Sequence, residues 1–257
     1  MQGLLFTYCF ILGACVGSFL NVVAERSAAP GSAPFWKGRS HCPACGATLT
    51  ALDMVPVLNW FYLGGKCRHC KAKVPFRYPL TEILGGLAAG LPVLAFGWAP
   101  AKWAVAFGAG ALLLLIALCD WDTMEIPDLF TLLLLIPAFG AVWAFPGLSF
   151  PARLIGAACV SLPLLGVNLA VPGAFGLGDV QLAAVCGFLL GWKLTLVGFF
   201  LALLLAGTQA AWLLGTGRAK RGQQAHMPFG PALCAGFWLA LLWGQSLLNW
   251  YLGFFPG

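Results

Sequence analysis

The chain has 257 residues, of which 61% are hydrophobic and only 9% are charged, and its formal net charge at pH 7 is +6. A soluble globular domain is roughly half apolar and a quarter charged, so this composition excludes one and indicates a protein embedded in a bilayer. The apolar stretches are continuous rather than alternating, which favours helices over a closed barrel. We therefore expect an all-α polytopic membrane protein.

About eight apolar segments have lengths suited to transmembrane helices. They cover residues 4–23, 80–98, 103–119, 129–146, 153–171, 180–192, 194–215 and 229–252. The sixth segment is short for a complete span. We expect three parts: a first transmembrane helix within 1–26, a small polar loop domain within 27–78, and a membrane-embedded domain within 79–257.

The basic residues predict the orientation of these segments. Eight of the 14 Lys and Arg residues fall between Arg26 and Arg77, and three more precede the last segment, namely Arg218, Lys220 and Arg221. The positive-inside rule assigns both loops to the cytoplasm, which puts the two chain ends outside. Membrane topology thus accounts for the net charge, and we infer no nucleic-acid binding from it.

Two CxxC pairs, separated by 21 residues, stand in the polar loop, and their members are Cys42, Cys45, Cys67 and Cys70. Four thiolates at this spacing are typical of a structural zinc site, and zinc would supply folding energy to a loop with little core. Disulfides are an alternative that a reducing cytoplasm disfavours, and redox-active thiols are another. Two neighbouring histidines could replace a ligand or could simply be solvated, and these are His41 and His69.

Four of the eight carboxylates lie between two apolar segments: Asp120, Asp122, Glu125 and Asp128. Ionisable groups at a membrane boundary indicate a functional site by default. Asp120 ends one apolar segment, where the helix dipole favours the protonated acid, whereas Asp179 begins another, where the dipole favours the carboxylate. Such a pair can divide the acid and base roles of a hydrolase. A helix cap is the structural alternative for Asp179, and Asp122 is the reserve for Asp120.

Two further polar residues lie near the ends of apolar segments. Glu82 follows Arg77-Tyr78-Pro79 at the start of the second segment and could pair with Arg77 or contact a substrate. Asn21, close to the end of the first segment, could line a site or bond a neighbouring helix. Neither choice can be made from spacing alone.

The order of the motifs resembles that of the type IV prepilin peptidases over nearly the whole chain. The motifs are Gly17-Ser18-Phe19-Leu20-Asn21, the two CxxC pairs, Arg77-Tyr78-Pro79 with Glu82, Asp120-Trp121-Asp122 with Ile126-Pro127-Asp128, Gly176-Leu177-Gly178-Asp179, and Pro228-Phe229-Gly230-Pro231. The resemblance implies a bacterial inner-membrane aspartic protease of the GxGD class, with Asp120 and Asp179 catalytic and the four cysteines holding zinc. It implies cleavage of the basic leader of type IV prepilins or type II secretion pseudopilins on the cytoplasmic side.

Many members of that family also methylate the new N-terminus with S-adenosylmethionine, so a peptidase-only member is one alternative. The sequence has no glycine-rich fingerprint for that cofactor, and its binding residues stay unassigned. We expect acidic side chains to contact the substrate, and the candidates are Asp122, Glu125, Asp128 and Glu82. Membrane lipid is the other expected partner.

Other classes of protein remain as rivals. An ion- or proton-coupled transporter also carries acids within the membrane, although no internal repeat is found here. A zinc hydrolase needs an open coordination position for water, and four thiolates would fill all four positions of the ion. A structural assembly factor is the third rival.

Overall fold

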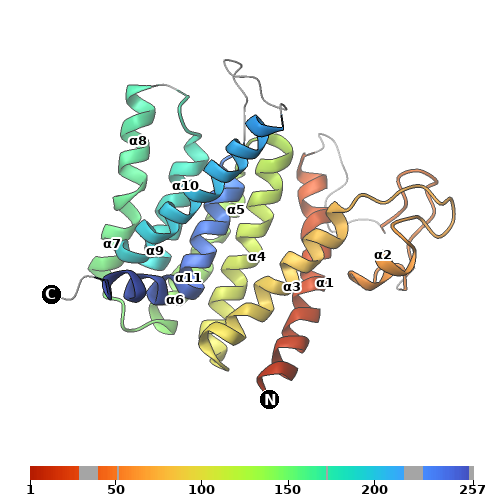
Figure 1. The fold of residues 1–257 in the computed structure, drawn as a ribbon, viewed down its shortest axis with the longest axis horizontal. Helices are drawn as coiled ribbons and strands as arrows, with labels where there is room; N and C mark the ends of the chain where they lie inside the picture. The colour runs from red at the N-terminus through yellow and green to blue at the C-terminus, as the bar shows by residue number, and fades with distance from the viewer. Residues whose placement is uncertain (29–39, 51, 172, 217–227, 255–257) are drawn as a thin grey trace. The chain divides into compact units, whose positions relative to one another are not determined.

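The computed structural model describes residues 1–28, 40–50, 52–171, 173–216 and 228–254 (Figure 1). Within these residues the secondary structure is helical, apart from two isolated bridges that join His41 to Thr48 and Lys66 to Lys73. The chain divides into two compact units, Met1–Trp98 and Ala99–Gly257. The predicted all-α class is confirmed.

The first unit is built on two long helices, α1 (Gln2–Ala28) and α3 (Arg77–Phe96), with the short α2 (Leu58–Tyr62) in the loop between them. α1 and α3 are antiparallel, since Gly13 meets Gly85 and Gly17 meets Thr81. A Cβ atom on Gly17 would lie 2.5 Å from the Thr81 carbonyl oxygen. Small residues let membrane helices approach this closely, so Gly17 is a packing residue.

Eight helices make up the described residues of the second unit, and prolines explain two of the breaks between them. They are α4 (Pro100–Thr123), α5 (Asp128–Leu133), α6 (Leu135–Ala144), α7 (Phe150–Cys159), α8 (Ser161–Ala170), α9 (Leu177–Leu190), α10 (Trp192–Gly215) and α11 (Gly230–Leu252). Proline lacks an N–H group and clashes with the carbonyl four residues earlier. Pro137 and Pro163 accordingly lie four residues beyond the ends of α5 and α7.

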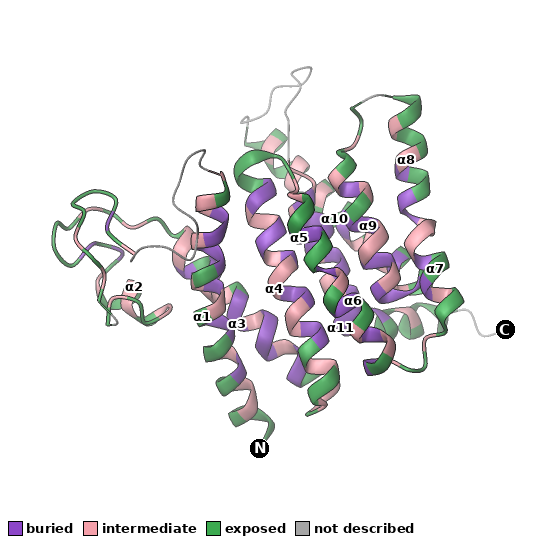
Figure 2. Cartoon of the chain, turned by 180° about the vertical axis from the view of Figure 1, so that it is seen from behind, coloured by how far each residue is buried: buried purple, intermediate pink, exposed green. Residues whose placement is uncertain are grey.

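Six helical stretches in the described part of the chain are long and apolar enough to cross a bilayer, as in a multi-pass membrane protein. They are Gln2–Ala28, Arg77–Phe96, Pro100–Thr123, Phe150–Ala170, Trp192–Gly215 and Gly230–Leu252. The other two predicted segments form shorter apolar helices, Asp128–Ala144 and Leu177–Leu190. Exposed residues occur on many helices (Figure 2). They include large apolar side chains such as Trp143 and Phe200, which suits contact with lipid. The basic loop with Arg218, Lys220 and Arg221 lies outside the described residues.

Arg153 on α7 is fully buried and bonds the ends of two other helices. Its Nη2 atom donates to the carbonyl oxygens of Ala141 (2.7 Å) and Phe145 (3.1 Å) at the end of α6. Its Nη1 atom donates to the carbonyl oxygens of Phe188 (3.4 Å) and Leu189 (3.1 Å) near the end of α9. The last carbonyls of a helix lack intrahelical partners and attract a cation, so this side chain ties α6, α7 and α9 together.

Arg153→Met should lower the unfolding free energy by about 3 kcal/mol, because it removes the side-chain donor to the Phe188 and Leu189 carbonyls and breaks the two bonds to carbonyls of α6. Thermal unfolding in detergent would show this as a lower midpoint. Arg153→Lys should fall between wild type and Arg153→Met, since it keeps the charge but reaches fewer carbonyls. Lys193→Met is the control, because Lys193 is an exposed base near Trp192. Equal midpoints for Arg153→Met and Lys193→Met would contradict the assignment.

Candidate active site and metal centre

Asp120 lies buried in the last turn of α4. Its Oδ2 atom accepts a hydrogen bond of 3.0 Å from the backbone N–H of Gly230, the first residue of α11. A Cβ atom on Gly230 would lie 2.6 Å from that oxygen. Only glycine therefore allows the start of α11 to approach Asp120, a role that the sequence did not reveal. The one local signal was a glycine between Pro228 and Pro231.

Asp179 is buried in the first turn of α9 and caps its own helix. Its Oδ2 atom accepts a hydrogen bond of 3.2 Å from the Gly176 N–H. A Cβ atom on Gly178 would lie 2.7 Å from Cβ of Ile126. The two glycines of the motif therefore have different roles. Gly176 donates its N–H group to the Asp179 side chain, and Gly178 lets the segment that carries Ile126 pack against α9.

The two aspartates come from distant parts of the second unit and are close enough for their charges to interact. Two buried cysteines, Cys186 on α9 and Cys234 on α11, belong to the same surroundings, since Cys234 interacts with Cys186 and with both acids. The Phe175 ring packs against the Phe229 ring with 5.8 Å between centroids. Two ionisable groups are thus held together with backbone N–H donors in a mostly apolar setting. Their catalytic role stays a prediction.

The other three acids of this stretch are exposed: Asp122, Glu125 and Asp128. α4 ends at Thr123, and Met124 follows in the left-handed conformation with its N–H bonded to the Asp120 carbonyl. Asp128 is the first residue of α5, where a negative charge suits the helix dipole. The chain reversal after α4 therefore separates a buried Asp120 from an exposed acidic surface.

The four cysteines of the CxxC pairs form a cluster whose sulfur atoms all lie within 4.8 Å of one another. Cys42 Sγ and Cys70 Sγ are 3.9 Å apart, close to the roughly 3.8 Å expected for tetrahedral Zn–S bonds of about 2.3 Å. No histidine belongs to the cluster within the part of the chain that is described. The donor set and its spacing fit a tetrahedral metal ion.

Both CxxC pairs adopt the same turn. The Cys42 carbonyl accepts the Gly46 N–H at 2.8 Å, and the Cys67 carbonyl accepts the Lys71 N–H at 3.1 Å. Gly46 and Lys71 have positive φ angles of 70° and 60°. Backbone N–H groups of Cys45 and Ala44 lower the pKa of Cys42 to about 7, and those of Cys70 and His69 lower the pKa of Cys67. The turn therefore favours the thiolate of the first cysteine in each pair, whereas burial and the neighbouring thiols raise the pKa of Cys70 to about 11.

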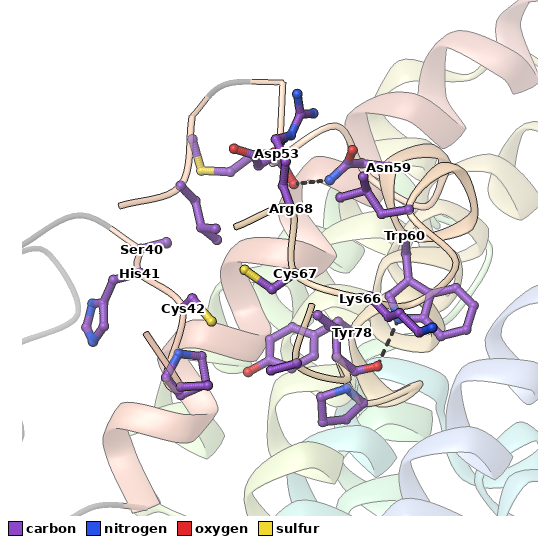
Figure 3. Close-up of a pocket in the computed structure, with 18 of the residues that line it drawn as sticks. Ser40, His41, Cys42, Asp53, Asn59, Trp60, Lys66, Cys67, Arg68 and Tyr78 are labelled. Atoms are coloured by element: carbon purple, nitrogen blue, oxygen red, sulfur yellow. Dashed lines mark hydrogen bonds and ion pairs between the residues drawn. The ribbon is translucent and has the colours of Figure 1, made fainter. Parts of the chain in front are cut away.

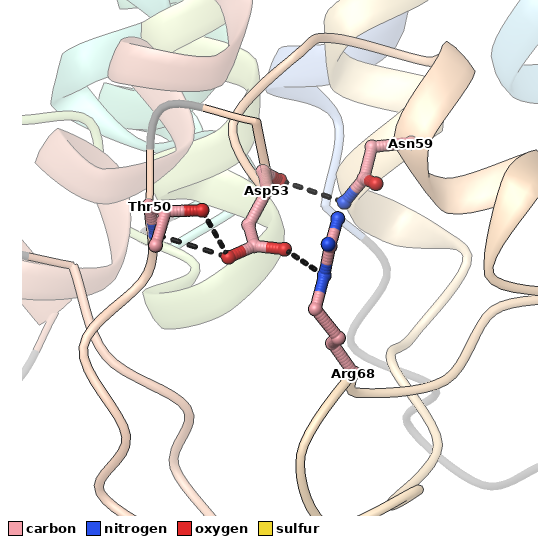
Figure 4. A network of polar contacts seen from close by, with 4 residues as sticks. All are labelled: Thr50, Asp53, Asn59 and Arg68. Atoms are coloured by element: carbon pink, nitrogen blue, oxygen red, sulfur yellow. Dashed lines mark hydrogen bonds and ion pairs between the residues drawn. The ribbon is translucent and has the colours of Figure 1, made fainter.

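A polar network connects the segment between the two CxxC pairs with Arg68, which lies inside the second pair (Figure 4). Asp53 accepts hydrogen bonds from the Thr50 hydroxyl (2.6 Å) and backbone N–H (3.0 Å), and it pairs with Arg68 at 2.8 Å. Asn59 Nδ2 donates to the Asp53 carbonyl at 2.9 Å. The Thr50 hydrogen bonds, with help from the Arg68 charge, lower the pKa of Asp53.

Glu82 and Asn21, the other two candidates, belong to the first unit. Glu82 Oε2 accepts the backbone N–H of Val57 at 2.7 Å. Asn21 is fully buried; its Oδ1 accepts from Arg77 Nε at 2.9 Å and its Nδ2 donates to Glu25 Oε1 at 3.0 Å. Asn21 therefore bonds both its own helix and α3, and Glu82 bonds the loop.

Comparison with known proteins gives a consistent family. The model of the bacterial peptidase A24 N-terminal domain matches residues 11–96, and that of the type IV leader peptidase family matches residues 107–211. No solved structure matches the chain significantly.

Several relatives are named prepilin leader peptidase/N-methyltransferase, and three of them illustrate the similarity. The Bacillus subtilis protein is 34% identical over 95% of this chain and 96% of its own length. The Aeromonas hydrophila protein is 33% identical over 97% of this chain and 94% of its own length. The Pseudomonas aeruginosa protein is 34% identical over 98% of this chain and 95% of its own length. These matches cover both units, so the chain belongs to the type IV leader peptidase family.

Proposed function

We propose that this protein is a membrane aspartic endopeptidase that removes the basic leader from type IV prepilins or type II secretion pseudopilins. The family of the chain and the names of its relatives support this class of reaction. The observation that carries the site assignment is the buried pair Asp120 and Asp179, whose charges interact although they come from different helices. We take these two residues to be the catalytic pair.

In the proposed reaction the pair shares one proton. The ionised carboxylate takes a proton from water as the water oxygen attacks the scissile carbonyl, and the protonated acid hydrogen-bonds the carbonyl oxygen. The proton is then delivered to the amine that leaves. Both Asp120 and Asp179 accept an N–H group at a helix start, so each carboxylate is oriented by the backbone, and the two charges are close enough to interact. Asp120 as the acid stays our prediction.

We further propose that the enzyme is bifunctional and methylates the new N-terminal amine. S-adenosylmethionine supplies the methyl group, and zinc on Cys42, Cys45, Cys67 and Cys70 is structural. Incubation of the full-length protein with a prepilin and methyl-labelled S-adenosylmethionine tests both activities. A peptidase-only member would shorten the prepilin without labelling it, and a transporter would do neither.

We place the active site and the zinc loop on the cytoplasmic side of the bacterial inner membrane. The distribution of Lys and Arg supports this orientation, because eight of 14 lie between Arg26 and Arg77. Membrane-impermeant thiol reagents applied to intact cells test it: Cys45 and Cys70 should react only after the inner membrane is opened and a chelator has removed the zinc.

The exposed acids Asp122, Glu125 and Asp128 are proposed to attract the basic leader. Replacing all three by Asn, Gln and Asn should raise KM by about tenfold at low salt, because each exposed charge pair contributes about 0.2–1 kcal/mol. The value of kcat should change little. Steady-state cleavage of a prepilin with its leader lysines or arginines replaced by Gln is the control, since that substrate should not distinguish the two enzymes. An unchanged KM for the basic leader would contradict the role.

Glu82, the remaining candidate for substrate contact, lies in the first unit. It borders a cavity whose chemistry points to the methyl donor rather than to the leader.

A further inference from the structure

The first unit contains a cavity of about 370 Å³, all of whose lining residues fall between Ser18 and Glu82. It is bounded by the last turns of α1, the first turns of α3 and the metal-binding loop (Figure 3). Its volume is within the range of about 300–1,000 Å³ usual for small-molecule and cofactor sites. The catalytic aspartates belong to the second unit, so the cavity is a separate feature.

Two carboxylates from the helices line this cavity, and the first, Glu25, is firmly held. Glu25 Oε1 accepts the Asn21 amide at 3.0 Å, and the Tyr78 hydroxyl also bonds the Glu25 carboxylate. Asn21 is itself fixed by complete burial and by its bond from Arg77. A polar chain across α1 and α3 therefore orients one acid at the cavity wall.

The second carboxylate, Glu82, organises a strained turn of the loop. Its Oε2 atom accepts the Val57 N–H at 2.7 Å, and the Ser18 hydroxyl is a second partner. Val57 has φ 62° and ψ −56°, and the Leu58 N–H bonds the Pro56 carbonyl at 2.6 Å. This is the rare form of γ-turn, and positive φ is unusual for a β-branched residue. Strained backbone concentrates at ligand sites. The strained turn at Val57 is bonded to Glu82, which lines the cavity.

Basic and aromatic side chains also line the cavity. Arg26 comes from the last turn of α1, and Lys66 and Lys73 come from the loop. The Trp60 ring is held in place because its Nε1 donates to the Val74 carbonyl at 3.1 Å and its edge packs on Phe76 with 5.6 Å between centroids. Figure 3 shows Trp60 and Tyr78 among the residues around the cavity. The wall thus offers fixed anions, cations and flat apolar surface at once.

We propose that this cavity is the binding site for S-adenosylmethionine, with Glu25 and Glu82 as its recognition residues. That ligand carries a sulfonium and an ammonium, which carboxylates attract, a carboxylate, which lysine and arginine attract, and an adenine, which packs on aromatic rings. Its ribose hydroxyls are further donors to carboxylates. The inference rests on the methyltransferase half of the proposed function and supplies the cofactor site that the sequence left unassigned.

Equilibrium dialysis of labelled S-adenosylmethionine with the full-length, zinc-loaded protein, without prepilin, tests the assignment. Glu82→Gln and Glu25→Gln should each raise Kd by about tenfold or more, since charged hydrogen bonds of this kind are strong. Lys193→Gln is the control; Lys193 is an exposed charged residue of the second unit, and this variant should keep the wild-type Kd. Zinc content and the unfolding midpoint report whether each variant is folded.

Photolabelling locates the site independently of any substitution. Ultraviolet irradiation with methyl-labelled S-adenosylmethionine, followed by peptide mapping, should place the label on the peptides that contain Trp60 or Tyr78. Excess unlabelled S-adenosylmethionine should abolish this label. Label confined to residues 99–257 would overturn the inference.

The outcomes separate this inference from the proposed function. If both glutamine variants bind as wild type does while wild type methylates prepilin, the cavity assignment fails and the function stands. If wild type binds no S-adenosylmethionine, the assignment fails together with the methyltransferase half of the function. Leader cleavage, measured on the same preparation, reports on the peptidase half alone.

Discussion

Replacing either Asp120 or Asp179 by Asn should reduce kcat for leader cleavage by about 10³- to 10⁴-fold, the size of effect typical of a lost general acid or base. An amide cannot take a proton from water, and it cannot return one to the leaving amine. Asn keeps the size of the side chain, and its Oδ1 can still accept the N–H of Gly230 or Gly176. The fold should therefore survive while the chemistry is lost.

The double variant Asp120→Asn/Asp179→Asn should be no slower than either single variant. Residues that act as one unit lose their joint effect at the first substitution. Single-turnover cleavage of a prepilin, with helicity and zinc content as controls for folding, measures all three enzymes. Cleavage that survives both single substitutions would end the aspartic-peptidase assignment.

Gly230 extends this reasoning to a residue without ionisable groups. Alanine would bring a Cβ atom to 2.6 Å from Asp120 Oδ2, so α11 or the carboxylate must move. Displacement by about 1 Å from a catalytic geometry can cost about 10²-fold in rate. A Gly230→Ala enzyme should thus be slow although both aspartates are present.

Removing zinc, or replacing Cys42 and Cys67 by Ser, should unfold the loop between α1 and α3. Among the described residues of 40–76 only Cys42, Gly65 and Cys67 are buried, so the loop has almost no apolar core. A structural zinc ion contributes about 10–16 kcal/mol in small peptides at pH 7, far more than the Asp53–Arg68 pair can supply. The ion is therefore expected to decide whether this loop is folded.

Zinc content and limited trypsin digestion measure the effect together. The double serine variant should contain no zinc and be cut rapidly at the loop bases, which are Lys66, Arg68, Lys71 and Lys73. Cys15→Ser is the control, because Cys15 lies on α1 outside the cluster. A metal-free loop as resistant to trypsin as wild type would contradict a structural role for the metal.

Helix capping and catalysis are compatible at Asp179. The sequence offered the cap as an alternative to the catalytic role, and the cap is present, since Asp179 Oδ2 accepts the Gly176 N–H. A carboxylate held by a helix start is oriented at no further cost. The second oxygen stays available for a proton shared with Asp120.

The sequence by itself determined the features that depend on local pattern. Continuous apolar stretches predict membrane helices because bilayer thickness sets their length, and all eight stretches are helical. CxxC spacing predicts a metal knuckle because two thiolates two residues apart reach one ion. The four sulfur atoms indeed lie within 4.8 Å of one another.

Only the tertiary structure decided which distant groups meet. Arg153 is the first residue of the expected segment 153–171, yet it is buried among carbonyls of α6 and α9. Gly230 is one residue of a short motif in the sequence, yet its N–H group donates to Asp120. Hydropathy and spacing describe each helix alone, whereas such contacts arise from how close-packed helices orient their faces. That packing, which no single segment encodes, brings Asp120 and Asp179 close enough for their charges to interact.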